Sequence, residues 1–93
     1  MSTIQILLLT QTACRLCEQA NQVLKRLAGE YDLAVTVVDL NTPGGRELAK
    51  AGLPFPPGVF LNDQLFSYGR LSERKLRRAL DRRLVADAGS APP

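Results

Sequence analysis

The chain has 93 residues, of which 45% are hydrophobic and 23% are charged, and its net charge is +3. These values are ordinary for one globular domain, which at this length buries about 60–65% of its unfolded surface. Histidine is absent, so no imidazole can serve as a base, a proton shuttle or a metal ligand. No apolar run is long enough to span a bilayer and the first residues carry no basic signal, so we expect a cytoplasmic protein without membrane contacts.

The first predicted strand covers Ile4–Leu9, a run of branched apolar residues typical of a strand that is buried on both faces. The apolar spacing then changes to three and four residues, which predicts a helix from about Cys14 to Leu27 or Ala28, ending at Gly29. The apolar stripe of this helix consists of Leu16, Ala20, Val23, Leu24 and Leu27.

Cys14 and Cys17 are the only cysteines, and they lie where this helix begins. Residues three apart project from the same side of a first turn, a separation that suits a disulfide. The helix N-terminus and Arg15 favour a thiolate at Cys14, while Glu18 partly opposes it. Cys14 is expected at the exposed end and Cys17 on the apolar face, as an attacking and a resolving thiol require. The pair is therefore a candidate redox site.

A second strand is predicted at Leu33–Leu40, which completes a strand-helix-strand unit with parallel strands. Thr42 and Pro43 form a good helix start, as N-cap and first helical residue. The short helix that follows is expected over about Gly45–Ala51, with Gly52 as its stop.

Three prolines within residues 53–57 exclude both a helix and a central strand from this segment. Gly58–Leu61 and Gln64–Tyr68 then read as two strands joined by a tight turn at Asn62-Asp63, which predicts a β-hairpin that Gly69 ends.

The last predicted helix covers about Glu73–Val85 and is capped by Ser72. Its arginines are interpreted as a solvated face, and the lack of interleaved aromatic residues disfavours nucleic-acid binding. Arg70 is a candidate contact for an acidic partner. The domain is expected to span 1–86, with a disordered tail at 87–93. The apolar stripe of the helix consists of Leu76, Ala79, Leu80 and Leu84.

The predicted order β-α-β-α-β-β-α gives an α/β fold, a four-stranded mixed sheet with helices on both faces, which is the minimal thioredoxin-like architecture. Within that superfamily the chain resembles the small glutaredoxin-like proteins that begin with Cys-x-x-Cys-(Asp/Glu)-x-Ala. Cys14, Cys17, Glu18 and Ala20 match this motif. The resemblance covers about Ile4 to Leu84, nearly the whole domain.

The resemblance implies further site residues. Superfamily members have a cis proline before the third strand that faces the cysteine pair, and Pro57 matches this position. Pro56 matches the residue whose backbone meets the substrate, and Tyr68-Gly69 stands where a Gly-Gly pair receives glutathione. The predicted catalytic residues are Cys14, Cys17 and Pro57, and the predicted substrate-binding residues are Thr12, Arg15, Leu16, Pro56, Tyr68 and Gly69.

Three departures from the family pattern affect the glutathione site. Arg15-Leu16 replaces the usual pair between the cysteines, the lysine common before the motif is missing, and the Gly-Gly pair appears only as Tyr68-Gly69. In addition, Pro56 has no N–H to donate to a bound substrate backbone. We therefore expect weak glutathione recognition and a protein disulfide reductase as the better reductant.

The sequence thus predicts a thiol–disulfide oxidoreductase, expected to be a monomer without a cofactor. Its expected partners are a disulfide-containing protein or small thiol, and a reductase or glutathione. The alternatives are a metal or iron–sulfur module and two inert thiols. Zinc prefers four protein ligands, so with two cysteines and no histidine a metal site would need a dimer or an added thiol.

Overall fold

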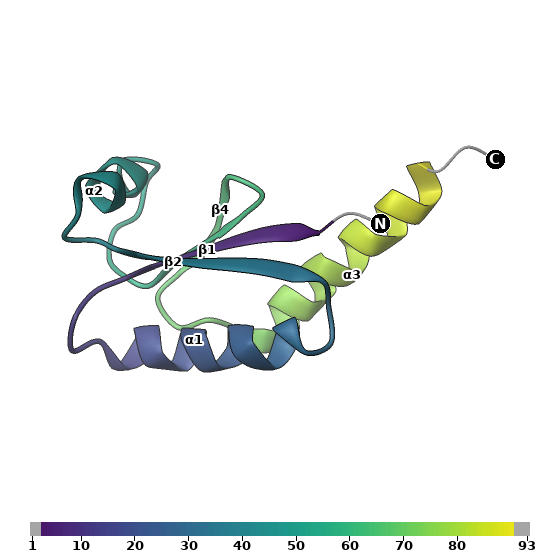
Figure 1. Cartoon of the computed structure of the whole chain (residues 1–93), viewed down its shortest axis with the longest axis horizontal. Coiled ribbons are helices and arrows are strands. Elements are labelled where there is room, and N and C mark those ends of the chain that lie inside the picture. Colours follow the sequence, from purple (N-terminus) through teal and green to yellow (C-terminus); the bar gives the residue numbers. More distant parts are fainter. Residues whose placement is uncertain (1–2, 91–93) are drawn as a thin grey trace.

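The computed structural model describes residues 3–90, and the side chains of residues 3–84. The α/β fold class and the predicted order of elements are confirmed (Figure 1). The elements are β1 (Ile4–Thr10), α1 (Arg15–Ala28), β2 (Leu33–Asp39), α2 (Pro43–Ala49), β3 (Gly58–Leu61), β4 (Gln64–Tyr68) and α3 (Glu73–Ser90).

The four strands form one mixed sheet in the order β2-β1-β3-β4. β1 and β2 are parallel, with Ile4 opposite Leu33, because α1 crosses between them. β3 is antiparallel to both β1 and β4. The hairpin turn has positive φ angles at Asn62 and Asp63, 46° and 69°, as a tight two-residue turn between twisted strands requires.

The hydrophobic core lies between the sheet and the helices α1 and α3, which cover the same face (Figure 1). The prediction that both faces of β1 are buried holds only toward its carboxyl end, since Leu9 is buried but Gln5 is exposed and Leu7 half-buried. α2 lies on the other side of the sheet from α1, and its Gly45 packs against Asp39 at the carboxyl end of β2 (Figure 1). The buried core includes Ile4, Ile6, Leu8, Ala20, Val23, Leu24, Leu27, Val59, Leu61, Leu71, Leu76, Ala79 and Leu80.

α1 begins one position later than the sequence suggested, because Cys14 is its extended N-cap residue. Gly29 ends the helix as predicted, but in a right-handed conformation with φ −80°. Leu16 is 37% exposed, so its place in the predicted apolar stripe was wrong. Leu16 lies at the edge of the stripe in the first turn of α1, whereas Cys17 in the same turn faces the core and is 3% exposed.

α2 covers Pro43–Ala49, so its predicted end at Ala51 was wrong. The N–H groups of Lys50 and Ala51 bond to carbonyls three residues earlier, which tightens the chain and ends the α-helix. The predicted N-cap is confirmed, since Thr42 Oγ1 accepts the Gly45 N–H at 3.0 Å. An added Cβ at Gly45 would overlap the carbonyl oxygen of Asp39, so glycine is what lets α2 approach β2.

α3 is capped by Ser72 as predicted, since its Oγ accepts the Lys75 N–H at 3.2 Å. The predicted end at Val85 was wrong, because α3 continues to Ser90. No strong helix breaker precedes Pro92 in this segment. Part of the expected tail, 91–93, lies outside the described residues. Leu84 is exposed, contrary to prediction, because α3 runs past the end of the sheet here (Figure 1).

Side chains also join α1 to α3. Arg77 donates to Glu30 at 2.6 Å and to Glu73 at 3.1 Å, and Arg26 donates to Glu73 at 2.6 Å. The bond from Arg77 holds the pKa of Glu30 below its ordinary value, and the bonds from Arg26 and Arg77 do the same for Glu73. Glu30 is exposed and Glu73 only half-buried, so these are surface ion pairs that add little to stability and mainly fix how α3 lies against α1 and the turn after it.

A side-chain amide ties α1 to the segment before α3. Gln19 donates its Nε2 to the carbonyl oxygen of Leu71 at 3.0 Å and accepts the Leu71 N–H on its Oε1 at 3.2 Å. Both backbone groups of Leu71 are therefore satisfied by one side chain of the helix that begins with the cysteines.

Candidate active site

The cysteine pair sits where β1 passes into α1. β1 ends at Thr10, and Ala13 adopts a left-handed conformation with φ 55°, which turns the chain toward the helix. Cys14 is then extended, with φ −118° and ψ 106°, as an N-cap residue must be. Cys14 and Cys17 form a disulfide, with their Cα atoms 5.2 Å apart. The predicted compatibility of this spacing with a disulfide is therefore confirmed.

The two sulfurs differ in exposure. Cys14 is half-buried, whereas Cys17 is 3% exposed and lies on the core face of α1. The Cys17 N–H donates to Cys14 Sγ at 3.1 Å, so the first helical turn offers its backbone donor to the outer sulfur. An incoming group can thus reach Cys14 more easily than Cys17.

A shallow hollow of about 200 Å³ opens beside the disulfide. Glu18 is the only ionisable side chain that lines it besides the cysteines, and Val37 comes from β2. Sequence reasoning missed Val37, because the strand-helix-strand unit implies parallel strands but not the register that sets Leu8 opposite Val37. The lining residues are Leu8, Thr10, Gln11, Ala13, Cys14, Cys17, Glu18, Asn21 and Val37.

The peptide bond between Pro56 and Pro57 is cis, which confirms the conformation expected of Pro57. Pro57 is fully buried, and it directly precedes β3. Leu9 pairs with Gly58, so continuing this register by one residue sets Pro57 opposite Thr10. The cis proline therefore lies at the same end of the sheet as the loop that leads to Cys14.

Gly69, which directly follows β4, is hydrogen-bonded to the cis proline at this end of the sheet. Its N–H donates to the carbonyl oxygen of Pro57 at 2.8 Å, and its φ of 72° suits glycine. An added Cβ at Gly69 would lie 3.0 Å from the ring of Phe55, which packs edge-to-face on Tyr68 with centroids 5.4 Å apart. Sequence reasoning missed Phe55. Tyr68 lines a different hollow from that of the sulfurs, between β4 and α3.

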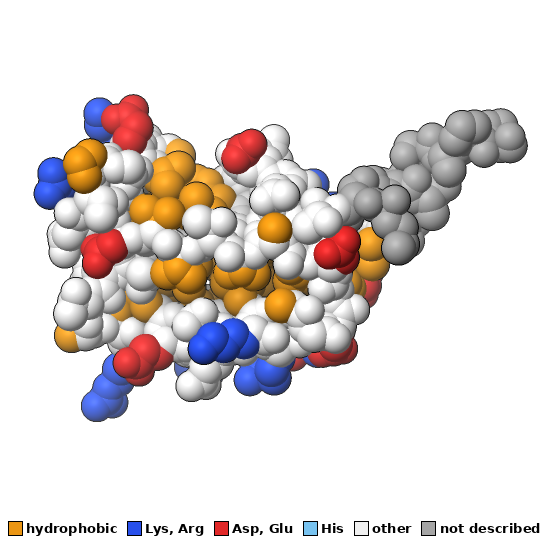
Figure 2. Space-filling model, in the orientation of Figure 1, with side chains coloured by type: hydrophobic (Ala, Val, Ile, Leu, Met, Phe, Trp, Pro, Cys, Tyr) orange, Lys and Arg blue, Asp and Glu red, His pale blue; other side chains and the backbone are white. Residues whose placement is uncertain are grey.

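The remaining predicted contact residues differ in exposure. Thr12 and Arg15 are exposed near the start of α1, and Pro56, before the cis proline, is half-buried. Phe55 and Tyr68 are 51% and 49% exposed, and the strand register sets Tyr68 at the end of the sheet where the loop to Cys14 begins. Figure 2 shows other hydrophobic side chains gathered over the sheet on the face it presents. This mixture of an accessible sulfur and exposed apolar side chains suits contact with a polypeptide.

The arrangement of side chains gives less support to a metal-binding site. Among residues 3–84, no three His, Cys, Asp or Glu side chains cluster as metal ligands would. A metal bound here would need ligands from a second chain or an added thiol, as the sequence analysis indicated. Within the described residues, no helix is long and apolar enough to cross a membrane.

A Cys-x-x-Cys disulfide at a helix N-terminus, beside a cis proline in a four-stranded mixed sheet, defines a protein of the thioredoxin superfamily. A family model described as "Glutaredoxin-like domain (DUF836)" matches residues 5–81. The chain belongs to this glutaredoxin-like family.

A solved structure supports the same fold. The N21Q mutant thioredoxin from Halobacterium salinarum NRC-1 superimposes with a TM-score of 0.68 and 21% sequence identity, over 87% of this chain and 74% of that one. No curated protein matches the sequence significantly. The structural likeness therefore supports the fold, and the family match shows the class of protein.

Proposed function

We propose that the protein is a thiol–disulfide oxidoreductase that uses Cys14 and Cys17 as its reacting pair. The observation that carries this proposal is the bonded pair itself, with one sulfur accessible at a helix N-terminus and the other buried one turn further on. Two inert structural thiols would not need this difference in access.

The reaction starts from the reduced pair. The Cys14 thiolate attacks one sulfur of a substrate disulfide, a mixed disulfide forms, and the other substrate sulfur leaves as a thiolate that takes a proton from water. The Cys17 thiol loses its proton and attacks Cys14 Sγ, which releases the second substrate thiol. The substrate disulfide has then gained two electrons and two protons, and the protein has become the disulfide. A second thiol pair restores the reduced form.

The helix start assists the first step. A thiolate at Cys14 accepts the Cys17 N–H, which already donates to this sulfur in the disulfide form at 3.1 Å. Cys17 reacts only within the molecule, because its burial prevents contact with a large substrate.

Reduction of a small uncharged disulfide by a chemical dithiol tests this proposal. Wild-type protein should accelerate the reaction and Cys14→Ser should not, while Ala13→Ser serves as a control for a new hydroxyl in the same loop. A wild-type rate equal to that of Cys14→Ser would overturn the proposal.

We further propose that a protein reductase, rather than glutathione, supplies the electrons. Pro56 precedes the cis proline and offers no N–H to a bound cysteinyl backbone, a loss of about 0.5–1.5 kcal/mol for one hydrogen bond. Thr10, Gln11 and Thr12 provide no cation before Cys14 for a glutathione carboxylate.

The two sources of electrons can be compared directly on one disulfide substrate. Thioredoxin reductase or a chemical dithiol should sustain turnover better than glutathione with its reductase. Efficient turnover at micromolar glutathione would contradict this preference without affecting the exchange activity itself.

A further inference from the structure

A basic groove runs between β4 and α3, outside the hollow that contains the sulfurs. It has a volume of about 420 Å³. Its walls include Ser67 and Tyr68 from β4, Arg70 from the connecting segment, and Lys75, Arg78 and Arg82 from α3. Among residues 3–84, no acidic side chain lines it.

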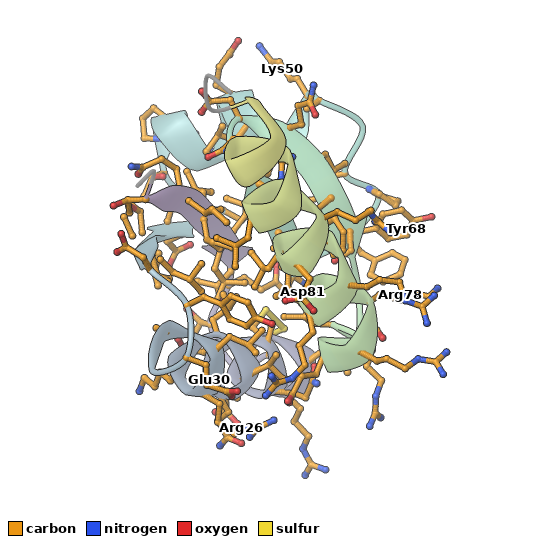
Figure 3. The ribbon with its side chains drawn as sticks, turned by 90° about the vertical axis from the view of Figure 1, so that its right-hand side faces the viewer. Arg26, Glu30, Lys50, Tyr68, Arg78 and Asp81 are labelled. Carbon is orange, nitrogen blue, oxygen red and sulfur yellow. A yellow bond between two sulfur atoms is a disulfide. The ribbon has the colours of Figure 1, made fainter. Side chains whose placement is uncertain are left out.

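These four cations have no ion-pair partner among the described side chains, residues 3–84. Arg77 on the same helix is bound to two carboxylates, so pairing is available on one side of α3 and absent on the other. Figure 3 shows Arg78 on the same side as Tyr68 and away from Glu30. Unpaired cations that line one groove attract an anionic ligand.

An unused hydrogen-bonding group lies beneath the groove. Ser67 lines the groove, but its Oγ is buried and has no hydrogen-bond partner among the described residues. A buried hydroxyl without a partner is uncommon, and rotation of this side chain would be needed to present it to a carboxylate or carbonyl oxygen in the groove.

The shape of the region favours an extended ligand over a compact one. β4 is the last strand of the sheet, so its outer edge has backbone groups that no neighbouring strand pairs. At Phe66 and Arg82 the groove continues into a second hollow of about 350 Å³, which Arg83 also lines. An edge strand beside a long basic wall suits an added polypeptide strand with acidic side chains.

The groove starts close to the active site. Gly69 lies between the groove residues Tyr68 and Arg70, and its N–H bonds to the carbonyl oxygen of the cis proline Pro57. A chain that lies in the groove would therefore approach the end of the sheet where Cys14 is accessible.

We infer that this groove binds an acidic, extended segment of the disulfide-containing protein that the enzyme reduces. The identification of the partner as a disulfide substrate rests on the proposed exchange activity, whereas the preference of the groove for an acidic, extended segment does not. Nucleic acid fits less well, because Tyr68 is the exposed aromatic side chain of the groove and it packs against Phe55, whereas single strands need repeated stacking surfaces.

The test compares two disulfide peptides that differ only in their flanks, one with Asp and Glu and the other with Asn and Gln. Wild-type kcat/KM at low salt should be at least about tenfold higher for the acidic peptide, and the advantage should shrink as salt rises. Arg78→Glu/Arg82→Glu should abolish the advantage. Lys25→Glu/Lys50→Glu, with the same change in charge at exposed sites outside the groove, should keep it.

Binding of a cysteine-free acidic peptide, followed by fluorescence anisotropy, separates this inference from the exchange activity. Weaker binding to the groove variant than to the control supports the groove even if neither disulfide peptide is reduced. Equal effects of both variants, no preference for acidic flanks, or displacement of the peptide by a tighter-binding oligonucleotide would overturn the inference. Arg78→Gln/Arg82→Gln replaces the groove variant if circular dichroism shows that the latter is unfolded.

Discussion

Cys14 and Cys17 are only three residues apart at the start of α1, yet their side chains differ in solvent exposure. Cys14 precedes the helix and remains half-buried, whereas Cys17 lies within it and faces the core. Since the helix periodicity alone assigns these faces, the difference in exposure could be predicted from the apolar stripe that follows Cys17.

The difference in exposure predicts an order of alkylation. In the reduced protein at neutral pH, iodoacetamide should modify Cys14 well before Cys17, because the reagent reaches Cys14 and the helix N–H favours its thiolate. Peptide mass spectrometry over time measures both rates. Equal rates or the reverse order would contradict the assignment of Cys14 as the attacking sulfur.

Removal of the inner thiol should trap the intermediate. Cys17→Ser keeps Cys14 but cannot resolve a mixed disulfide, so exposure to a disulfide peptide should leave a stable adduct at Cys14. Intact-mass measurement detects the adduct, and Cys14→Ser is the control that should show none. If Cys17→Ser turns over as fast as the wild type, Cys17 has no resolving role.

Among the site residues, those within a local motif could be predicted from the sequence, whereas those that other segments of the chain bring to the site were missed. Cys14 and Cys17 follow from the motif, and the cis conformation of Pro57 follows from the family resemblance. Phe55 and Val37 could not be predicted, because their positions depend on strand register and on how the chain folds back over Gly69.

Among the elements, α2 depends on two adjacent glycines with different surroundings. A Cβ at Gly45 would overlap the backbone of Asp39, whereas a Cβ at Gly44 would meet nothing within 4 Å. The sequence alone could not show which of the two glycines permits the contact with β2.

Alanine at the two positions should therefore act in opposite directions. Gly45→Ala should lower the free energy of unfolding by about 1–3 kcal/mol, because α2 must move away from β2. Gly44→Ala should raise it by about 0.4–1 kcal/mol, since it removes freedom from the unfolded chain. Urea unfolding followed by circular dichroism measures both. Similar changes for the two variants would contradict the packing of α2.

For the whole molecule, the sequence predicted the fold class and the order of elements, because each local pattern agreed with one architecture. The predicted burial of side chains was less accurate near the ends of the helices. Leu84 and Leu16 belong to apolar stripes but are 44% and 37% exposed, since Leu84 lies where α3 runs past the sheet and Leu16 lies at the edge of its stripe beside the buried Cys17. The periodicity of a helix shows which face is apolar, and not how far the neighbouring element extends along it.

The ion pairs between α1 and α3 predict a pH dependence of stability. Folding lowers the pKa of Glu30 and Glu73, so their contribution is present above the ordinary value of 4.5 and is lost as the pH falls through the folded values. Arg77→Ala should lower the urea midpoint at pH 7 and have less effect at pH 3. Arg74→Ala, an exposed cation outside these pairs, should lower it little at either pH. A pH-independent effect of Arg77→Ala would indicate lost packing instead.

The bonds between Gln19 and Leu71 have a consequence for hydrogen exchange. The Leu71 amide belongs to no helix or strand, yet it is held by a side chain of the helix that carries the cysteines. Its exchange with deuterium therefore reports separation of α1 from the segment before α3, and not the unwinding of a helix. In a nuclear magnetic resonance spectrum this single proton should be protected in the wild type and exchange rapidly in Gln19→Ala.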